Sequence, residues 1–371
     1  MAKLPVIDCD SHVEECEATW QYLDKRYWHR RPLHLDLHGT PGRSLQDSYW
    51  LIDGRTHPRP EGLASTIGGS PPSSTLGRGK SFSLGSQTLD DIPARLADMD
   101  QLGIDVSVLY PTATLTHLTD DPRYEAALMR SYNTWLAERC SHAPHRLKFG
   151  ALVPLRSPQD AIAEVKRAKE LGAVSLFSMG TAGEKMLDDE SLDPVYEEVV
   201  KQDLPFTVHV GWSHPGLTAS CNDLYAGFTV SFTLPVLMGF FSMTAGGVLD
   251  RHPGLKLAFL EAGGDWLPFW VHRLDQYHPL VRALGRPVSN EKPGEYLKTG
   301  SVYFSVEGDE AGVPTVVELL GEDHVMSSAD IPHAEAREKH LEIMAGREDL
   351  PARVREKILT HNPARFYGLK I

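Results

Sequence analysis

The sequence contains few cysteines, and their arrangement excludes one class of protein. Of its 371 residues only four are cysteines, Cys9, Cys16, Cys140 and Cys221, and no two are spaced as a C-x-x-C pair. No disulfide framework is indicated, which is typical of proteins from a reducing cytosol. The N-terminus also lacks the basic segment followed by an apolar run that a secretory signal needs. We therefore expect a cytoplasmic protein.

Positive charge is also scarce. Lys and Arg number 37 against 50 Asp and Glu, so the formal net charge is −13. Nucleic acids and anionic membranes bind through a basic face, so neither is an expected partner. The most apolar run, 226–249, is interrupted by Pro235 and a pair of glycines. It predicts a buried helix rather than a membrane span, because a span needs about 20 mostly apolar residues.

No strand is followed by a glycine-rich phosphate loop, which disfavours an open, doubly wound sheet. What the sequence does contain is a regular alternation of β-branched runs with helical patterns. The expected strands are 4–7, 104–110, 147–153, 173–177, 205–210, 255–260, 301–306 and 324–329, and the last two expected helices are 334–345 and 351–359. Eight repeats predict one α/β domain over 1–371, a distorted (β/α)8 TIM barrel.

Residues 16–87 interrupt this rhythm as a long insertion near the N-terminus. Residues 16–50 mix His, Arg and Tyr, and residues 53–87 are dense in Gly, Ser, Pro and Arg. The second stretch is too loose to predict a core. Long insertions in compact enzymes are usually lids or binding loops, so we predict a lid; a disordered surface excursion is the alternative.

Ionisable residues follow several expected strands, at the end where a barrel carries its chemistry. The first strand runs into Asp10 and His12, which point to the same side of an extended chain because they are two residues apart. Later strands lead into further candidates: His209 after the fifth, Glu261 after the sixth, and Asp330 with His333 after the eighth. Neighbouring carboxylates repel one another unless a cation lies between them. The pattern predicts a divalent metal site at the barrel mouth.

Six motifs resemble the amidohydrolase superfamily, in the branch that includes aminocarboxymuconate semialdehyde decarboxylase. They are I-D-C-D-S-H at 7–12, V-H-V-G at 208–211, D-R-H-P-G-L-K at 250–256, L-E-A-G-G-D-W-L-P at 260–268, S-A-D-I-P-H at 328–333 and N-P-A-R-F-Y at 362–367. The resemblance covers nearly the whole chain apart from the insertion. It implies a distorted TIM barrel, often a homodimer, with metal ligands at Asp10, His12, His209 and Asp330.

Three departures from that family pattern bear on the chemistry. The ligand pair of the first motif is Asp10-x-His12, where the family usually has His-x-His or Glu-x-His, and Glu261 stands where the decarboxylase members carry a histidine. The fourth strand, 173–177, has no lysine to bridge two metals as in the hydrolytic members. Glu261 can supply a bridge, since a carboxylate can span two metals about 3.5–4 Å apart. A buried salt bridge to an arginine such as Arg251 is the alternative.

Other residues near the mouth have open roles. Trp212 and His214 follow the fifth strand and are expected to bind substrate, with loop packing as the alternative for His214. Glu14 and Glu15 can reach the site from the first loop or lie in solvent. Tyr110 and His117 follow the second strand; packing is their expected role, with lining of the pocket as the alternative. Cys9 is expected in the core, and Glu307 is expected beside a helix cap.

Three reaction classes fit such a site: hydrolysis by an activated water, non-oxidative decarboxylation of an acid, and oxygenation. A donor set rich in carboxylates suits iron as well as manganese or zinc. Our main hypothesis is a non-haem di-iron monooxygenase, similar to a small subgroup of the superfamily, with a hydrolase or decarboxylase as the alternative. Its metal ligands are Asp10, His12, His209, Glu261, Asp330 and His333, of which Glu261, Asp330 and His333 are also the catalytic candidates. The expected partners are then a small-molecule substrate, dioxygen and an electron donor.

Overall fold

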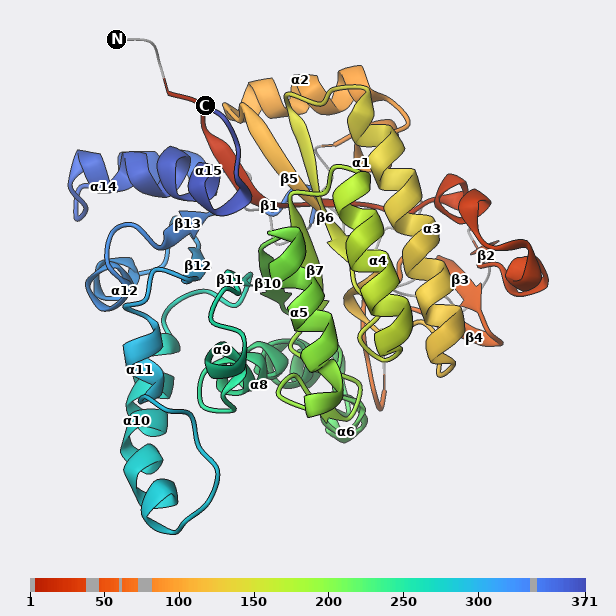
Figure 1. Cartoon of the computed structure of the whole chain (residues 1–371). Helices are drawn as coiled ribbons and strands as arrows, with labels where there is room; N and C mark the ends of the chain where they lie inside the picture. The colour runs from red at the N-terminus through yellow and green to blue at the C-terminus, as the bar shows by residue number, and fades with distance from the viewer. Residues whose placement is uncertain (1–3, 38–46, 60–61, 73–81, 334–338) are drawn as a thin grey trace.

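Eight parallel strands form the central barrel (Figure 1). The computed structural model describes residues 4–37, 47–59, 62–72, 82–333 and 339–371. In spatial order, which is also chain order, the strands are β1 (Ile7–Val13), β5 (Val106–Pro111), β6 (Leu147–Leu152), β7 (Ser175–Met179), β10 (Phe206–His209), β11 (Leu257–Leu260), β12 (Val302–Val306) and β13 (Val325–Ser327). The eight predicted strands and the predicted TIM-barrel fold are confirmed.

The chain joins the first and last strands near their C-terminal ends. The N–H of His12 donates to the carbonyl of Ile331 at 2.7 Å, and the N–H of Asp330 donates to the carbonyl of Asp10 at 3.0 Å. The buried carboxylate of Asp8 also accepts the N–H of Ala329 at 2.9 Å. These bonds tie the segment after β13 to β1, so residues 320 positions apart in sequence lie side by side.

Helices cover the outside of the barrel (Figure 1). They are α1 (Leu84–Gln87), α2 (Ile92–Leu102), α3 (Pro122–Ser141), α4 (Pro158–Glu170), α5 (Asp193–Gln202), α6 (Pro215–Ser220), α7 (Leu224–Ala226), α8 (Leu234–Met243), α9 (Val248–Arg251), α10 (Leu267–Ala283), α11 (Pro293–Tyr296), α12 (Val313–Leu320), α13 (His340–Gly346), α14 (Ala352–Glu356) and α15 (Asn362–Tyr367). Of the predicted helix 334–345, residues 334–338 lie outside the described residues.

Local signals explain where these helices begin and end. The carboxylate of Asp91 accepts the N–H of Ala94 at the start of α2, and Gly103 ends that helix with a φ of 72°. Asp121 caps α3 in the same way, next to a proline in the first turn. An acidic N-cap satisfies N–H groups that have no partner within the helix, and glycine adopts the left-handed closing conformation at little cost.

The first strand lies further along the chain than predicted. We expected 4–7, but β1 begins at Ile7, runs to Val13 and pairs with β5 as far as Pro111. The register with β5 shifts between Asp8 and Ser11, and the strand continues through these polar residues. Asp10 and His12 are therefore held inside a paired strand, which restrains them more than a loop would.

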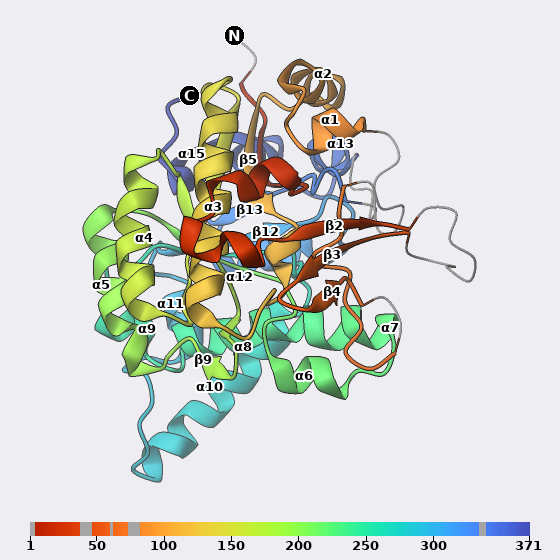
Figure 2. The same ribbon diagram turned by 90° about the vertical axis from the view of Figure 1, so that its right-hand side faces the viewer.

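The insertion after β1 contains more structure than predicted. Two 3₁₀ helices, Glu17–Tyr22 and Lys25–Arg30, precede a small antiparallel sheet of β2 (Leu33–Asp36), β3 (Ser48–Ile52) and β4 (Arg55–His57) beside the barrel (Figure 2). Trp20 and Trp50 pack edge to face, with their ring planes at 90°, and Trp50 is 1% exposed. The prediction that 53–87 is too loose to contribute to a core is wrong for Phe82, which is 9% exposed and belongs to the hydrophobic core. Residues 38–46, 60–61 and 73–81 of the predicted lid lie outside the described residues.

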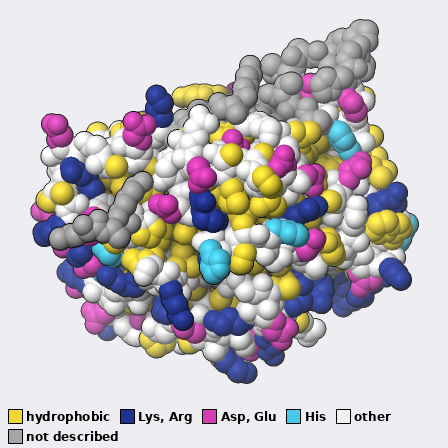
Figure 3. Space-filling model, turned by 90° about the horizontal axis from the view of Figure 1, so that it is seen from above, with side chains coloured by type: hydrophobic (Ala, Val, Ile, Leu, Met, Phe, Trp, Pro, Cys, Tyr) yellow, Lys and Arg dark blue, Asp and Glu magenta, His cyan; other side chains and the backbone are white. Residues whose placement is uncertain are grey.

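The most apolar segment forms one helix, Leu224–Met243, with a π-helical stretch at Gly227–Phe232. By length and composition alone this helix is long enough to cross a membrane. Val236, Phe240 and Met243 on one of its faces are buried in the core, whereas Leu234 and Phe241 are 37% and 36% exposed, so the predicted burial holds for one face only. On the face of the molecule seen in Figure 3, acidic and basic side chains are intermixed with apolar ones.

Candidate metal centre

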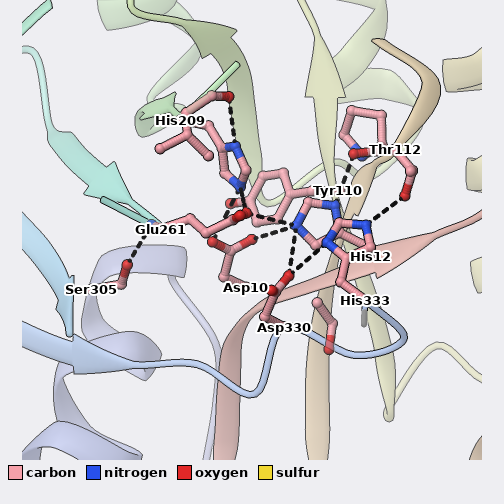
Figure 4. A network of polar contacts seen from close by, with 12 residues as sticks. Asp10, His12, Tyr110, Thr112, His209, Glu261, Ser305, Asp330 and His333 are labelled. Atoms are coloured by element: carbon pink, nitrogen blue, oxygen red, sulfur yellow. Dashed lines mark hydrogen bonds and ion pairs between the residues drawn. The ribbon is translucent and has the colours of Figure 1, made fainter. Parts of the chain in front are cut away.

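The barrel mouth brings the six predicted ligands together (Figure 4). One group of donors consists of Asp10, His12, His209 and Glu261, and a second consists of His12, Glu261, Asp330 and His333. Within each group the donor atoms lie within 4.8 Å of one another. The two groups share His12 and Glu261, so they form one continuous cluster. The residues that the sequence singled out therefore meet; their role as ligands stays a prediction.

Two imidazole nitrogens lie at the middle of the cluster. Nε2 of His12 is 3.5 Å from Asp10, 3.4 Å from Glu261 and 3.3 Å from Asp330. Nε2 of His209 is 3.3 Å from Asp10 and 3.0 Å from Glu261. Each histidine thus faces several carboxylate oxygens, which is the arrangement that a shared cation produces.

Backbone carbonyls fix which nitrogen each of these histidines presents. Nδ1 of His12 is 2.8 Å from the carbonyl oxygen of Pro111, and Nδ1 of His209 is 3.0 Å from that of Val210. A carbonyl only accepts, so Nδ1 is the protonated nitrogen in both rings. The lone pair of Nε2 in the neutral ring then points into the cluster, as a metal ligand requires.

Several donor atoms of the cluster have no hydrogen bond. They are both carboxylate oxygens of Asp10, Nε2 of His12, Nε2 of His209 and Oε2 of Glu261. Asp10, His12 and His209 are fully buried, and the Glu261 side chain is 4% exposed. Buried polar atoms without partners are costly, at about 1–3 kcal/mol each. A divalent metal would satisfy all of them, so these residues fit the metal that the sequence predicts.

Charge coupling within the cluster keeps a proton on His209. Burial lowers the pKa of His209, but the carboxylates of Asp10 and Glu261 outweigh it and raise that pKa well above its usual value. Burial likewise raises the pKa of Glu261, and the neighbouring imidazoles of His209 and His12 outweigh it and hold that pKa well below its usual value. A cation that binds here must displace the proton of His209, so metal uptake is expected to release protons.

Two of the carboxylates sit on strained backbone. Glu261 has a φ of +60° and Asp330 a φ of +54°, in the left-handed region that costs an ordinary residue roughly 1–3 kcal/mol. The N–H of Glu261 donates to the hydroxyl of Ser305 at 3.0 Å, which holds the turn after β11 in place. Such strain is typical of functional sites.

The proposed bridge from Glu261 to Arg251 does not form, because Arg251 pairs with Asp193 at 3.0 Å.

Asp8 is not one of the donors, but its hydrogen bonds position the residues that carry them. Its carboxylate accepts hydrogen bonds from the Ser11 hydroxyl and from the N–H groups of Ala329 and Asp10. Burial raises the pKa of Asp8 to about 6, although these bonds lower it. The carboxylate thus joins β1 to the segment that carries Asp330, which positions donors from both ends of the barrel.

The structure places the predicted substrate residues beside the mouth but in packing or capping contacts. Nδ1 of His214 accepts the N–H of Leu217 at 3.2 Å and caps α6. Trp212 is 3% exposed and packs on Phe232, with ring centroids 4.3 Å apart. Substrate contact by Trp212 and His214 stays a prediction.

The other sequence candidates lie outside the cluster. Cys9 and Tyr110 are fully buried in the core, and His117 pairs with Glu125 at 2.7 Å, as the packing hypothesis predicts. Glu307 belongs to a separate group with Asp309 and His340. Sequence reasoning missed Pro111, Thr112 and Ser305, since a carbonyl or a hydroxyl that orients a distant residue leaves no pattern in the sequence.

Glu15 yields a pH-dependent prediction. It accepts the N–H groups of Ala113 at 2.7 Å and Thr112 at 3.3 Å, and burial nevertheless raises its pKa to about 8. A carboxyl group whose pKa is higher in the folded state than in the unfolded state does not lower the free energy of unfolding below pH 4.5, its ordinary pKa. As the pH rises from 4.5 to 8, it lowers the free energy of unfolding progressively. Glu15→Gln keeps an oxygen for both N–H groups and cannot ionise. It should match the wild type at pH 4.5 and be more stable at pH 8.5, on the order of 2–4 kcal/mol.

Urea unfolding at the two pH values measures this difference. Glu17→Gln, which neutralises an exposed carboxylate two residues along the chain, is the matched control and should show no pH-dependent gap. An equal difference between Glu15→Gln and the wild type at both pH values would contradict the prediction.

Comparisons with known proteins agree with this architecture. The chain matches the sequence profile of the amidohydrolase family over residues 7–369. It is 25% identical over 284 residues to 2-amino-3-carboxymuconate-6-semialdehyde decarboxylase from Dictyostelium discoideum, covering 75% of this chain and 77% of that protein. An amidohydrolase from Mycobacterium avium subsp. paratuberculosis K-10 shares the fold over 100% of both chains, with a TM-score of 0.78 and 20% identity.

A further solved structure is that of 5-carboxyvanillate decarboxylase from Novosphingobium aromaticivorans DSM 12444. Its TM-score is 0.67 at 25% identity, with 74% of this chain and 80% of that chain covered. That protein was solved with manganese and 3-methoxy-4-hydroxy-5-nitrobenzoic acid.

Proposed function

This chain belongs to the amidohydrolase family, and on that premise we propose that it is a metal-dependent, non-oxidative decarboxylase of a small aromatic carboxylic acid. The observation that carries the proposal is the buried donor set of Asp10, His12, His209 and Glu261. Both oxygens of Asp10, Nε2 of each histidine and Oε2 of Glu261 face one another without a hydrogen bond. Two of the similar proteins are decarboxylases of carboxylic acids, and one of them holds manganese. These similarities support the alternative hypothesis better than the di-iron monooxygenase.

The four buried donors would hold one divalent metal, with Nε2 of each histidine and the carboxylate oxygens as ligands. When bound, the metal would act as a Lewis acid that fixes and polarises an anionic substrate. Burial of these donors excludes water, which strengthens the electrostatic interactions of the centre. Asp330 and His333 complete the rim of the centre next to His12.

Asp330 and His333 are placed to supply the proton that the reaction consumes. Decarboxylation breaks the bond between a ring carbon and the carboxylate, carbon dioxide leaves, and the ring carbon takes one proton. Oδ1 of Asp330 is 2.9 Å from Nδ1 of His333, within hydrogen-bond reach. We assign Asp330 as the proton donor to the ring carbon and His333 as the group that returns a proton to Asp330.

A second candidate function rests on Glu261. This residue stands where the decarboxylase members carry a histidine, and it belongs to both donor groups. Glu261 can therefore bridge two metals, with Asp330 and His333 completing the second group. Two irons so held would suit hydroxylation of the substrate by dioxygen, with an external electron donor.

One experiment separates the two functions. The chain is purified without added metal, its metals are counted by mass spectrometry, and it is incubated with hydroxylated and methoxylated benzoic acids. We expect one divalent metal per chain and release of one carbon dioxide per substrate consumed, at equal rates in air and under argon. A His209→Ala chain, which lacks one ligand, is the control for metal-independent release. Two irons per chain with substrate-dependent oxygen uptake would replace this proposal by the second candidate.

A further inference from the structure

His333 contacts a partner through each of its ring nitrogens (Figure 4). Nδ1 is 2.9 Å from Oδ1 of Asp330, and the ring stacks on that of His12 with centroids 4.1 Å apart. Nε2 is 2.9 Å from Oγ1 of Thr112. The residue is 8% exposed. The ring is thus held between one contact that faces the centre and another that faces the end of β5.

The hydroxyl of Thr112 determines which atom donates in the second contact. A hydroxyl has one proton, and Oγ1 of Thr112 lies 2.9 Å from the carbonyl oxygen of Val13, which can only accept. Because that proton is given to Val13, Oγ1 meets His333 as an acceptor. Nε2 of His333 therefore carries a hydrogen, and Nδ1 is the nitrogen that faces Asp330.

Thr112 is itself held in place by buried neighbours. The buried carboxylate of Glu15 accepts its N–H at 3.3 Å and that of Ala113 at 2.7 Å. The preceding residue, Pro111, accepts Nδ1–H of His12 at 2.8 Å. Two consecutive residues at the end of β5 thus orient the two stacked rings in opposite ways. Pro111 binds Nδ1 of His12, so that His12 presents Nε2 to the centre. Thr112 binds Nε2 of His333, so that His333 presents Nδ1.

We propose that Thr112 is a positioning residue, which fixes the ring of His333 with Nε2 protonated so that proton exchange with Asp330 runs through Nδ1. The catalytic part of this inference rests on the proposed function, since it requires a proton to reach the substrate through Asp330. The orienting part rests on the three hydrogen bonds of Thr112 alone. A hydrogen-bonding partner behind an active-site histidine is typically worth 10–100-fold in activity or metal affinity.

Kinetics of the metal-loaded enzyme test the catalytic part. Thr112→Val replaces the acceptor oxygen by a methyl group of similar size, and Thr112→Ser keeps the hydroxyl. We expect kcat of Thr112→Val to fall about 10–100-fold with KM within twofold of the wild type, and Thr112→Ser to stay within threefold. The matched control is Thr114→Val, a buried threonine two residues along whose hydroxyl has no hydrogen bond. It should keep the wild-type kcat. An equal loss in Thr112→Ser and Thr112→Val would overturn the proposal, because it would show a merely structural role.

Histidine NMR of the metal-free chain tests the orienting part without any activity. The NMR signal of the hydrogen on Nε2 of His333 is assigned by its loss in His333→Gln. This hydrogen should exchange slowly with water in the wild type and in Thr112→Ser. In Thr112→Val it should exchange so fast that its signal is no longer observed. Absence of this signal from the wild type, or its persistence in Thr112→Val, would overturn the proposal. A signal that behaves as expected in a chain that decarboxylates no acid would refute the proposed function and still support the role of Thr112.

Discussion

Replacement of Asp10 by asparagine is expected to lower the affinity for a divalent metal about a thousandfold, equivalent to about 4 kcal/mol. Asp10 is fully buried, and both of its carboxylate oxygens lack hydrogen bonds while facing His12 and His209. Asparagine has the same shape but carries no negative charge and directs an N–H₂ group into the centre. The wild type at a metal concentration 100 times its dissociation constant should gain about 2.7 kcal/mol of stability, a shift of a few degrees in Tm, and Asp10→Asn should lose this shift.

Calorimetric titration and thermal melts with and without metal measure both effects. Titration in weakly buffered solution should also show proton release from the wild type, because the cation displaces the proton of His209. Asp24→Asn, which removes an exposed carboxylate of the insertion, is the matched control and should behave as the wild type. An Asp10→Asn chain that binds metal within threefold of the wild type would show that Asp10 is not a ligand.

The barrel and its donor set were predictable because both depend on local patterns. Each buried strand appears as an apolar run, and a polar residue directly after such a run must lie at the C-terminal rim of a parallel barrel. His209 ends β10, Glu261 directly follows β11 and Asp330 lies three residues after β13, so their meeting follows from the topology without knowledge of any distance. His333 is less determined, since it lies three residues beyond the strand's polar end in a segment whose course depends on contacts with Thr112 and Asp330.

The length of β1 and the structure of the insertion were not predictable in this way. Asp8, Asp10 and His12 look like the end of a strand because they are polar, but the closed barrel buries them and the register shift keeps them paired with β5. In the insertion, Trp20 and Trp50 pack together from positions 30 residues apart, in one cluster with Tyr124 and Leu128 of α3. Non-local packing therefore overrode the loop-like composition.

The choice of reaction required information that the donor residues do not carry. Glu261 in place of histidine favoured a two-metal oxygenase, since a carboxylate can bridge. The same residue can also act as the fourth ligand of a single metal, because its Oε2 lies 3.0 Å from His209 and 3.4 Å from His12. Both arrangements use the same atoms, so the proposed function rests on the similarity to decarboxylases as well as on the donor set.

The second large effect is expected at Asp330. Asp330→Asn should lower kcat for carbon dioxide release by about 10²–10⁴-fold at saturating metal, the usual contribution of a general acid, with KM changed only a few-fold. The side chain is 1% exposed and faces both His12 and His333, and its backbone N–H bond to Asp10 is independent of the side chain. Asparagine thus preserves the turn but cannot carry the proton to the ring carbon. Steady-state kinetics with the metal content of each sample determined separately provide the measurement.

A double-mutant cycle with His333→Gln distinguishes loss of the proton path from loss of a ligand. If Asp330 and His333 pass one proton in sequence, removal of either residue disables the same step, and the double variant should be no more than about tenfold slower than Asp330→Asn alone. The 2.9 Å contact between Oδ1 and Nδ1 makes such coupling a direct physical consequence of the geometry. Multiplicative losses in the double variant, or a kcat of Asp330→Asn within tenfold of the wild type, would contradict the assignment of Asp330 as the proton donor.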